Sequence, residues 1–62
     1  LTVKSERAFK VLVKTAFNQR RKTLRNAVKS LFTPEVLADE LFNRRAETLS
    51  VEEFAALTFR MS

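Results

Sequence analysis

The chain has 62 residues and a net charge of +5, with no Gly, Cys or His. The lack of Cys and His excludes disulfides, zinc sites built on thiolate or imidazole, and nucleophiles activated by a His base. The lack of Gly excludes phosphate-cradling P-loops and G-x-G-x-x-G turns, so we expect no catalytic, cofactor-binding or metal-binding residue in this chain.

The composition predicts a folded protein outside the membrane. Apolar residues make up 45% of the chain, which is too many for disorder, and the longest apolar run, residues 54–57, is too short to span a bilayer. We therefore expect a single soluble domain. Because the chain begins at Leu1 rather than Met and has no signal-peptide pattern, we expect it to be a piece of a longer protein.

The first predicted helix covers residues 6–18, with Ser5 as its N-cap and Glu6 in its first turn. An inward-facing apolar stripe at helical spacing comprises Phe9, Leu12, Val13, Ala16 and Phe17. The polar run at residues 18–23 interrupts this stripe and predicts a turn. Asn18 is the residue we expect to take the left-handed conformation there.

Three further helices are predicted at residues 21–32, 34–42 and 51–61. The Thr33-Pro34 pair ends the first of these and begins the second, and a capping box of Ser50 and Glu53 begins the last. The inward arc of the last helix comprises Val51, Phe54, Ala55, Leu57, Thr58 and Met61. No alternating strand pattern is present, so we predict an all-α fold, a small bundle of about four short helices.

Charge is divided unevenly along the chain. Residues 1–32 carry nine Lys and Arg against one acid, Glu6, a net of +8, whereas residues 33–62 carry three Arg against six acids, a net of −3. Between Arg7 and Pro34 there is no acid, so local i,i+4 pairs cannot neutralise the basic side chains. Ordinary surfaces mix both signs. We therefore interpret this stretch as a cationic ridge that binds phosphates rather than as a solvated helix face.

The candidate nucleic-acid-binding residues are the polar and basic side chains of this stretch. The dense run at residues 20–22 and Arg25 form its centre, flanked by outer phosphate contacts and one neutral donor. The full set is Lys10, Lys14, Gln19, Arg20, Arg21, Lys22, Arg25 and Lys29. Base stacking on aromatic rings is not predicted, because Phe9, Phe17 and Phe54 fall on inward faces; Phe59 lies near a helix edge.

The segment at residues 16–26, Ala-Phe-Asn-Gln-Arg-Arg-Lys-Thr-Leu-Arg-Asn, resembles the start of the C-terminal helical domain of the ribosomal RNA adenine dimethyltransferases, the KsgA/RsmA family. The likeness continues through Leu31-Phe32 and returns at residues 47–54. It departs at residues 42–46, where the family often has a Gly-containing turn and an Arg-Pro pair. The basic block favours the small-subunit enzymes over the large-subunit enzymes of antibiotic resistance.

The resemblance implies that residues 1–62 form a single C-terminal RNA-docking domain, with a Rossmann-like catalytic domain upstream. The parent enzyme would use S-adenosylmethionine to dimethylate two adjacent adenines of small-subunit ribosomal RNA during ribosome biogenesis. The family's cofactor and target-base motifs do not occur in this chain. The implied partners are small-subunit ribosomal RNA or the assembling subunit and the chain's own N-terminal catalytic domain, and we expect a monomer.

Other functions also fit the residues. A free-standing DNA-binding domain of helix-turn-helix type would bind duplex DNA, usually as a dimer. A protein-interaction domain would present the basic face to an acidic protein. Within the methyltransferase interpretation, some of the basic residues 20–25 would alternatively anchor the catalytic domain rather than RNA.

Overall fold

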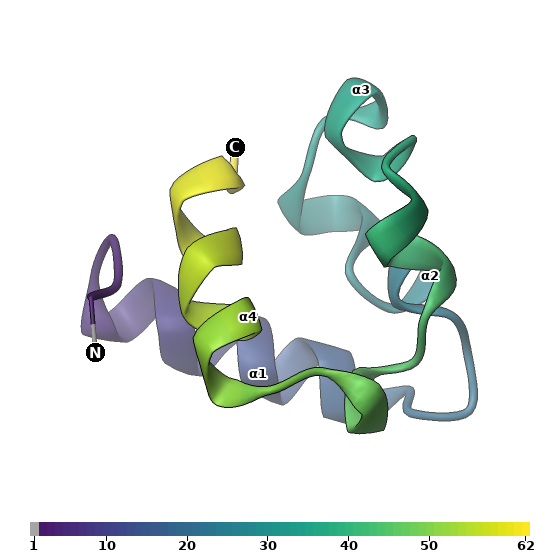
Figure 1. The fold of residues 1–62 in the computed structure, drawn as a ribbon, viewed down its shortest axis with the longest axis horizontal. Helices are drawn as coiled ribbons and strands as arrows, with labels where there is room; N and C mark the ends of the chain where they lie inside the picture. The colour runs from purple at the N-terminus through teal and green to yellow at the C-terminus, as the bar shows by residue number, and fades with distance from the viewer. Residues whose placement is uncertain (1) are drawn as a thin grey trace.

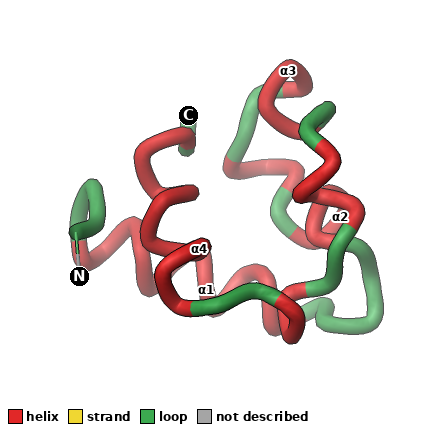
Figure 2. Tube along the Cα trace, viewed as in Figure 1, coloured by secondary structure: helices red, strands yellow, loops and turns green. Residues whose placement is uncertain are grey.

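The computed structural model describes residues 2–62; Leu1, whose identity suggested an excised piece, lies outside the described residues. The predicted all-α fold is confirmed, because residues 2–62 form helices and turns without a strand (Figure 2). The α-helices are α1 (Glu6–Asn18), α2 (Leu24–Ala27), α3 (Pro34–Leu37) and α4 (Val51–Leu57). Four 3₁₀ helices accompany them: η1 (Lys29–Leu31), η2 (Glu40–Asn43), η3 (Ala46–Thr48) and η4 (Thr58–Arg60).

The long helix α1 forms one side of the molecule, and the other elements pack along it in two groups (Figure 1). One group is α4 with η4, which ends at the C-terminus; the other contains α2, α3 and η2. Helix α1 contacts α2, α4, η3 and η4, and α2 contacts η2. No helix in the described part of the chain is long and apolar enough to cross a bilayer.

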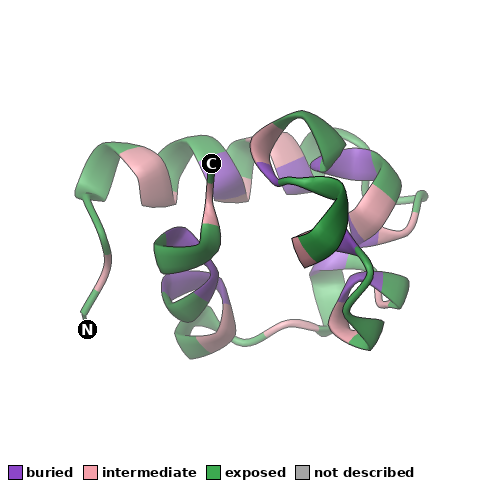
Figure 3. Cartoon of the chain, turned by 90° about the horizontal axis from the view of Figure 1, so that it is seen from above, coloured by how far each residue is buried: buried purple, intermediate pink, exposed green. Residues whose placement is uncertain are grey.

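The core lies between α1 and these two groups, where the buried segments of each element face one another (Figure 3). Burial of these side chains drives folding, at roughly 25 cal/mol per Å² of apolar surface. The rings of Phe32 and Phe42 meet edge to face, with centroids 5.1 Å apart. The core comprises Leu12, Ala16, Leu24, Ala27, Val28, Phe32, Leu37, Phe42, Ala46, Phe54 and Leu57.

The predicted helix starts at Ser5, Thr33 and Ser50 are confirmed. The Ser5 hydroxyl accepts a hydrogen bond from the Ala8 amide at 2.9 Å, and that of Thr33 accepts from the Val36 amide at 3.4 Å. At α4 both halves of the capping box are present: Ser50 accepts from the Glu53 amide, and the Glu53 carboxylate accepts from the Ser50 amide. Each bond satisfies a helix-terminal amide that has no partner within its helix.

The boundary between α1 and α2 differs from the prediction. Helix α2 begins at Leu24 rather than residue 21, because the Leu24 amide donates to the Arg44 carbonyl at 2.7 Å, a contact from a distant part of the chain. Asn18 remains helical, and no residue among 2–62 has positive φ, so the expected left-handed turn is wrong. Instead, Gln19 leaves the helix at φ −131°, and its carbonyl accepts from the Lys22 amide at 2.9 Å.

The three later helices are each divided where one continuous helix was predicted. The predicted helix at residues 21–32 is divided at Val28 into α2 and η1. The predicted helix at residues 34–42 is interrupted before η2, because the backbone of Asp39 is extended and its carboxylate accepts a hydrogen bond from the Leu41 amide at 2.9 Å. The segment 51–61 narrows to 3₁₀ geometry at Thr58, whose hydroxyl donates to the Ala55 carbonyl. A side-chain cap therefore accounts for the break at Asp39, whereas no side-chain cap bond accompanies the starts of η1 and η4.

Two residues expected on inward faces are exposed. Phe17 is 43% exposed and Val51 is 56% exposed, although Phe54, Ala55, Leu57 and Thr58 are buried as predicted. Both exceptions lie at helix ends, Phe17 in the last turn of α1 and Val51 at the first position of α4, where they are only partly covered; Phe17 still contacts Phe54 of α4. Phe59, expected near a helix edge, is 54% exposed.

Phe42 is the core residue whose truncation we expect to be most damaging. Replacing this fully buried ring with Ala should lower the free energy of unfolding by about 3–5 kcal/mol, enough to unfold a domain this small. The exposed ring of Phe59 provides the control, since Phe59→Ala should change stability by about 0.5 kcal/mol or less. Urea denaturation followed by circular dichroism measures both, and similar losses for the two variants would contradict the assignment of the core.

Candidate nucleic-acid interface

Helix α1 presents basic side chains on the face opposite the core. Lys10 and Lys14 are exposed and one turn apart, and Arg7 is exposed one turn earlier. The apolar stripe of the same helix holds Leu12 and Ala16 fully buried, which fixes the rotation of the helix about its axis. Lys10 and Lys14 are therefore displayed toward solvent by the packing of the core.

The loop between α1 and α2 carries the densest charge. Gln19, Arg20, Arg21 and Lys22 are all exposed, and the loop projects from the end of the molecule where α1 stops (Figure 2). Its two ends are held: one by the last turn of α1, the other by the bond from the Leu24 amide to the Arg44 carbonyl. Four consecutive polar residues are thus presented between two anchored positions.

An open hollow of about 440 Å³ lies at this loop. Its walls combine one aromatic ring with amide and cationic side chains, so it offers both apolar surface and hydrogen-bond donors. The lining residues are Phe17, Asn18, Gln19, Arg20, Arg21 and Lys22. Three of these six are cations, and no acid lines the hollow, so an anionic ligand is favoured.

The basic side chains of α1, the loop and η1 form no ion pair within the structure. Among residues 2–62 the ion pairs are Arg44 with Glu53 at 2.7 Å and Arg60 with Asp39 at 3.1 Å, both formed by arginines of the second half. The candidate set includes Lys29, which is exposed on η1. Five exposed cations at positions 10, 14 and 20–22 are therefore left for an external anion, and Lys29 on η1 is a further exposed cation.

Arg25 differs from the other candidates because its guanidinium is used inside the domain. Its Nε donates to the Leu37 carbonyl at 2.7 Å, one terminal nitrogen to the Asn43 side-chain oxygen, and the other to the Asp39 carbonyl at 3.3 Å. The residue is half-buried. Arg25 thus connects α2 to the α3–η2 segment, and the structure places it as a support of the ridge rather than at its outer surface.

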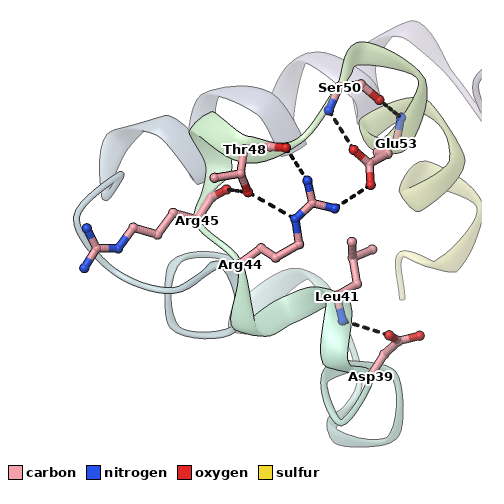
Figure 4. A network of polar contacts seen from close by, with 7 residues as sticks. All are labelled: Asp39, Leu41, Arg44, Arg45, Thr48, Ser50 and Glu53. Carbon is pink, nitrogen blue, oxygen red and sulfur yellow. Dashed lines mark hydrogen bonds and ion pairs between the residues drawn. The ribbon is translucent and has the colours of Figure 1, made fainter.

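Arg44 is a second internal arginine, which the sequence analysis did not identify. Its Nε donates to the Thr48 hydroxyl at 3.1 Å, one terminal nitrogen to the Glu53 carboxylate at 2.7 Å, and the other to the Thr48 carbonyl (Figure 4). The neighbouring Arg45 extends in the opposite direction and is exposed (Figure 4). The departure from the family pattern at residues 42–46 was the one sequence signal at this position.

The two acids of these ion pairs have lowered pKa values. For Glu53 the Ser50 amide is the main cause and the Arg44 guanidinium adds to it, so the pKa lies below its ordinary value of 4.5. For Asp39 the Leu41 amide is the main cause and Arg60 contributes, so the pKa lies below 3.8. Hydrogen bonds to the charged form stabilise that form. Both carboxylates are therefore ionised at neutral pH and act as structural acceptors.

The chain is similar over most of its length to curated bacterial proteins of one name, ribosomal RNA small subunit methyltransferase A. It is 55% identical over 56 residues to the protein of Phocaeicola vulgatus, 56% over 55 residues to that of Bacteroides thetaiotaomicron, and 54% over 54 residues to that of Flavobacterium johnsoniae. The family resemblance is confirmed. The aligned residues are 87%, 86% and 86% of this chain but only 20%, 21% and 21% of those proteins.

The chain therefore spans about one fifth of the length of the ribosomal RNA small subunit methyltransferase A proteins that it matches. No family model and no solved structure matches it. The names of the relatives concern the complete proteins.

Replacing Arg25 with Lys tests its internal role. A lysine cannot reproduce the three bonds of the guanidinium, so Arg25→Lys should lower the free energy of unfolding by about 1–3 kcal/mol at unchanged net charge. The matched control is Arg21→Lys, which alters an exposed loop residue and should change stability by about 0.5 kcal/mol or less. Urea denaturation of both variants gives the comparison, and equal effects would show that Arg25 does not support the fold.

The lowered pKa of Glu53 predicts a pH-dependent stability. Because the folded-state pKa lies below the unfolded value, the contribution of this carboxylate is complete above about pH 4.5 and is lost as the pH falls through the folded pKa. The melting temperature of Glu53→Gln should therefore lie below that of the unaltered chain at pH 7 and approach it at pH 3. Glu52→Gln, at the adjacent exposed acid, is the control. If the difference in melting temperature between Glu53→Gln and the unaltered chain stays constant with pH, the lowered pKa of Glu53 is contradicted.

Proposed function

We propose that this domain docks structured RNA of the small ribosomal subunit onto its cationic ridge. The supporting observation is the set of exposed cations from Lys10 to Lys22 on α1 and the α1–α2 loop, between which no acid occurs and none of which forms an ion pair in the described residues. Free cations on one surface bind phosphate oxygens and release counterions from the nucleic acid. The proposed RNA-binding residues are Lys10, Lys14, Gln19, Arg20, Arg21, Lys22 and Lys29, supported by Arg25.

Structured RNA suits this surface better than the major groove of DNA. A helix-turn-helix domain inserts a recognition helix into that groove, but α2, which follows the basic loop, has only four residues. RNA helices are recognised mainly through phosphates, 2′-hydroxyls and shape, which a loop and a helix face can contact without entering a groove. The ridge combines these two elements.

The parent protein of this proposal is a ribosomal RNA adenine dimethyltransferase of the cytoplasm, acting as a monomer. Its catalytic domain lies upstream, binds S-adenosylmethionine and dimethylates two adjacent adenines. The present residues do not fit that cofactor, because the chain contains no Gly with which to build a nucleotide-binding turn. Their role is to hold ribosomal RNA beside the catalytic domain so that an unstacked adenine reaches its pocket.

The salt dependence of binding tests this proposal. If the ridge contacts about four to six phosphates, the logarithm of the association constant for RNA should fall steeply as the logarithm of the salt concentration rises. The double variant Arg21→Ala/Lys22→Ala should reduce the magnitude of this slope by about 1.5–2. Fluorescence anisotropy would compare the terminal hairpin of small-subunit ribosomal RNA with duplex DNA of equal length. Lys4→Ala is the control, because this exposed lysine precedes α1, whereas the basic loop follows the other end of that helix.

The possible results separate the alternatives. Tighter binding to RNA, with a salt slope that depends on Arg21 and Lys22 but not on Lys4, supports RNA docking. Equal affinity for duplex DNA would favour the DNA-binding alternative. No binding at 50 mM salt would contradict the proposal and leave the ridge as an anchor for the catalytic domain or a surface for an acidic protein.

A further inference from the structure

The hollow beside the basic loop contains an exposed aromatic ring. Phe17 lies in the last turn of α1 and is 43% exposed, although the other large apolar residues of this stripe are buried or half-buried. Its ring contacts Phe54 with centroids 6.0 Å apart and an angle of 42° between the ring planes. Phe54 itself is buried in the core. One side of Phe17 is therefore fixed against the core, and the remainder faces the hollow.

The surroundings of Phe17 distinguish it from the other exposed aromatic ring. Phe59 lies on η4 next to Arg60, whose guanidinium is paired with Asp39. Phe17 lies beside Arg20, Arg21 and Lys22, which have no partner of this kind in the described chain. An aromatic surface within a ring of free cations matches a ligand that has both a flat apolar face and adjacent negative charges.

The lining of the hollow has the chemistry of a nucleotide site. The hollow has a volume of about 440 Å³ and is open to solvent rather than enclosed. The side-chain amides of Asn18 and Gln19 line it and can donate to or accept from the edge of a base. Because the ring of Phe17 is already immobilised against Phe54, little conformational freedom is lost when a base stacks on it.

We propose that this hollow binds an unpaired purine base of RNA, which stacks on Phe17 while the adjoining phosphates contact Arg20, Arg21 and Lys22. This inference rests on the proposed RNA-docking function and narrows its ligand. A paired base is stacked on both faces within its helix and cannot reach Phe17, whereas a bulged or loop base can. A purine offers the larger stacking surface. The domain then selects RNA that carries an unpaired purine next to a helix.

The test compares two RNA duplexes, one fully paired and one with a single bulged 2-aminopurine. The unaltered chain should bind the bulged duplex about five- to tenfold more tightly, and the emission of 2-aminopurine should fall on binding as the base stacks. Phe17→Leu should remove this preference, while Phe17→Tyr should retain it. In both variants the affinity for the paired duplex and its salt slope should be unchanged. Phe59→Leu is the matched control and should behave as the unaltered chain does.

Two further measurements separate loss of stacking from loss of folding in the Phe17 variants. Circular dichroism establishes that each variant is folded, since Phe17 also contacts the core through Phe54. Phe17→Trp keeps an aromatic ring at this position, and its emission should be quenched by bulged RNA but not by paired RNA. This variant reports stacking directly, even if Phe17→Leu is too unstable to measure.

The results distinguish failure of this inference from failure of RNA docking. If the unaltered chain binds neither duplex, the docking function and the base site are both overturned. If it binds both equally with a steep salt dependence, docking stands and the base site is overturned. A preference for bulged RNA that persists in Phe17→Leu, or a Phe17→Trp emission that does not respond, also overturns the site. Loss of the preference in Phe17→Leu, with retention in Phe17→Tyr and Phe59→Leu, supports the base site.

Discussion

The organisation of this domain depends on Arg44. Its guanidinium joins the connection after η2 to the start of α4 through Thr48 and Glu53, and its carbonyl accepts the hydrogen bond from Leu24 that begins α2. A single residue therefore contacts both the start of α4 and the start of α2, which are distant in sequence. Its side chain is 40% exposed, so the ion pair with Glu53 is worth little by itself in water. Its importance lies in geometry, because it positions two helix starts at once.

The local structure was predictable where a short sequence pattern determines it. The caps at Ser5, Thr33 and Ser50 and the apolar stripes led to the correct number of α-helices and to most of the core. Helix ends were less predictable. The start of α2 depends on the Arg44 carbonyl, which lies 20 positions further along the chain, and no local pattern carries that information.

The sequence predicted the charged stretch of the candidate site, but it did not predict which of its side chains are exposed in the folded chain. Charge counts cannot distinguish Arg25, which donates to the Leu37 and Asp39 carbonyls, from Arg21, which is exposed in the loop. Periodicity placed Phe17 in the core because it continues the α1 stripe. In the folded chain that stripe extends beyond the neighbouring elements, which leaves the ring partly uncovered. The internal position of Arg25 and the exposure of Phe17 both result from tertiary packing, so local sequence patterns do not predict them.

The absence of positive φ among residues 2–62 has a consequence for how this domain can be altered. A turn that requires the left-handed region favours Gly, Asn or Asp, but no described turn here requires that region. The backbone therefore requires no Gly, Asn or Asp at positions 19–22, and these four side chains are exposed. The ligand preference of this loop can therefore be redesigned with residues that keep the Lys22 amide, which donates to the Gln19 carbonyl.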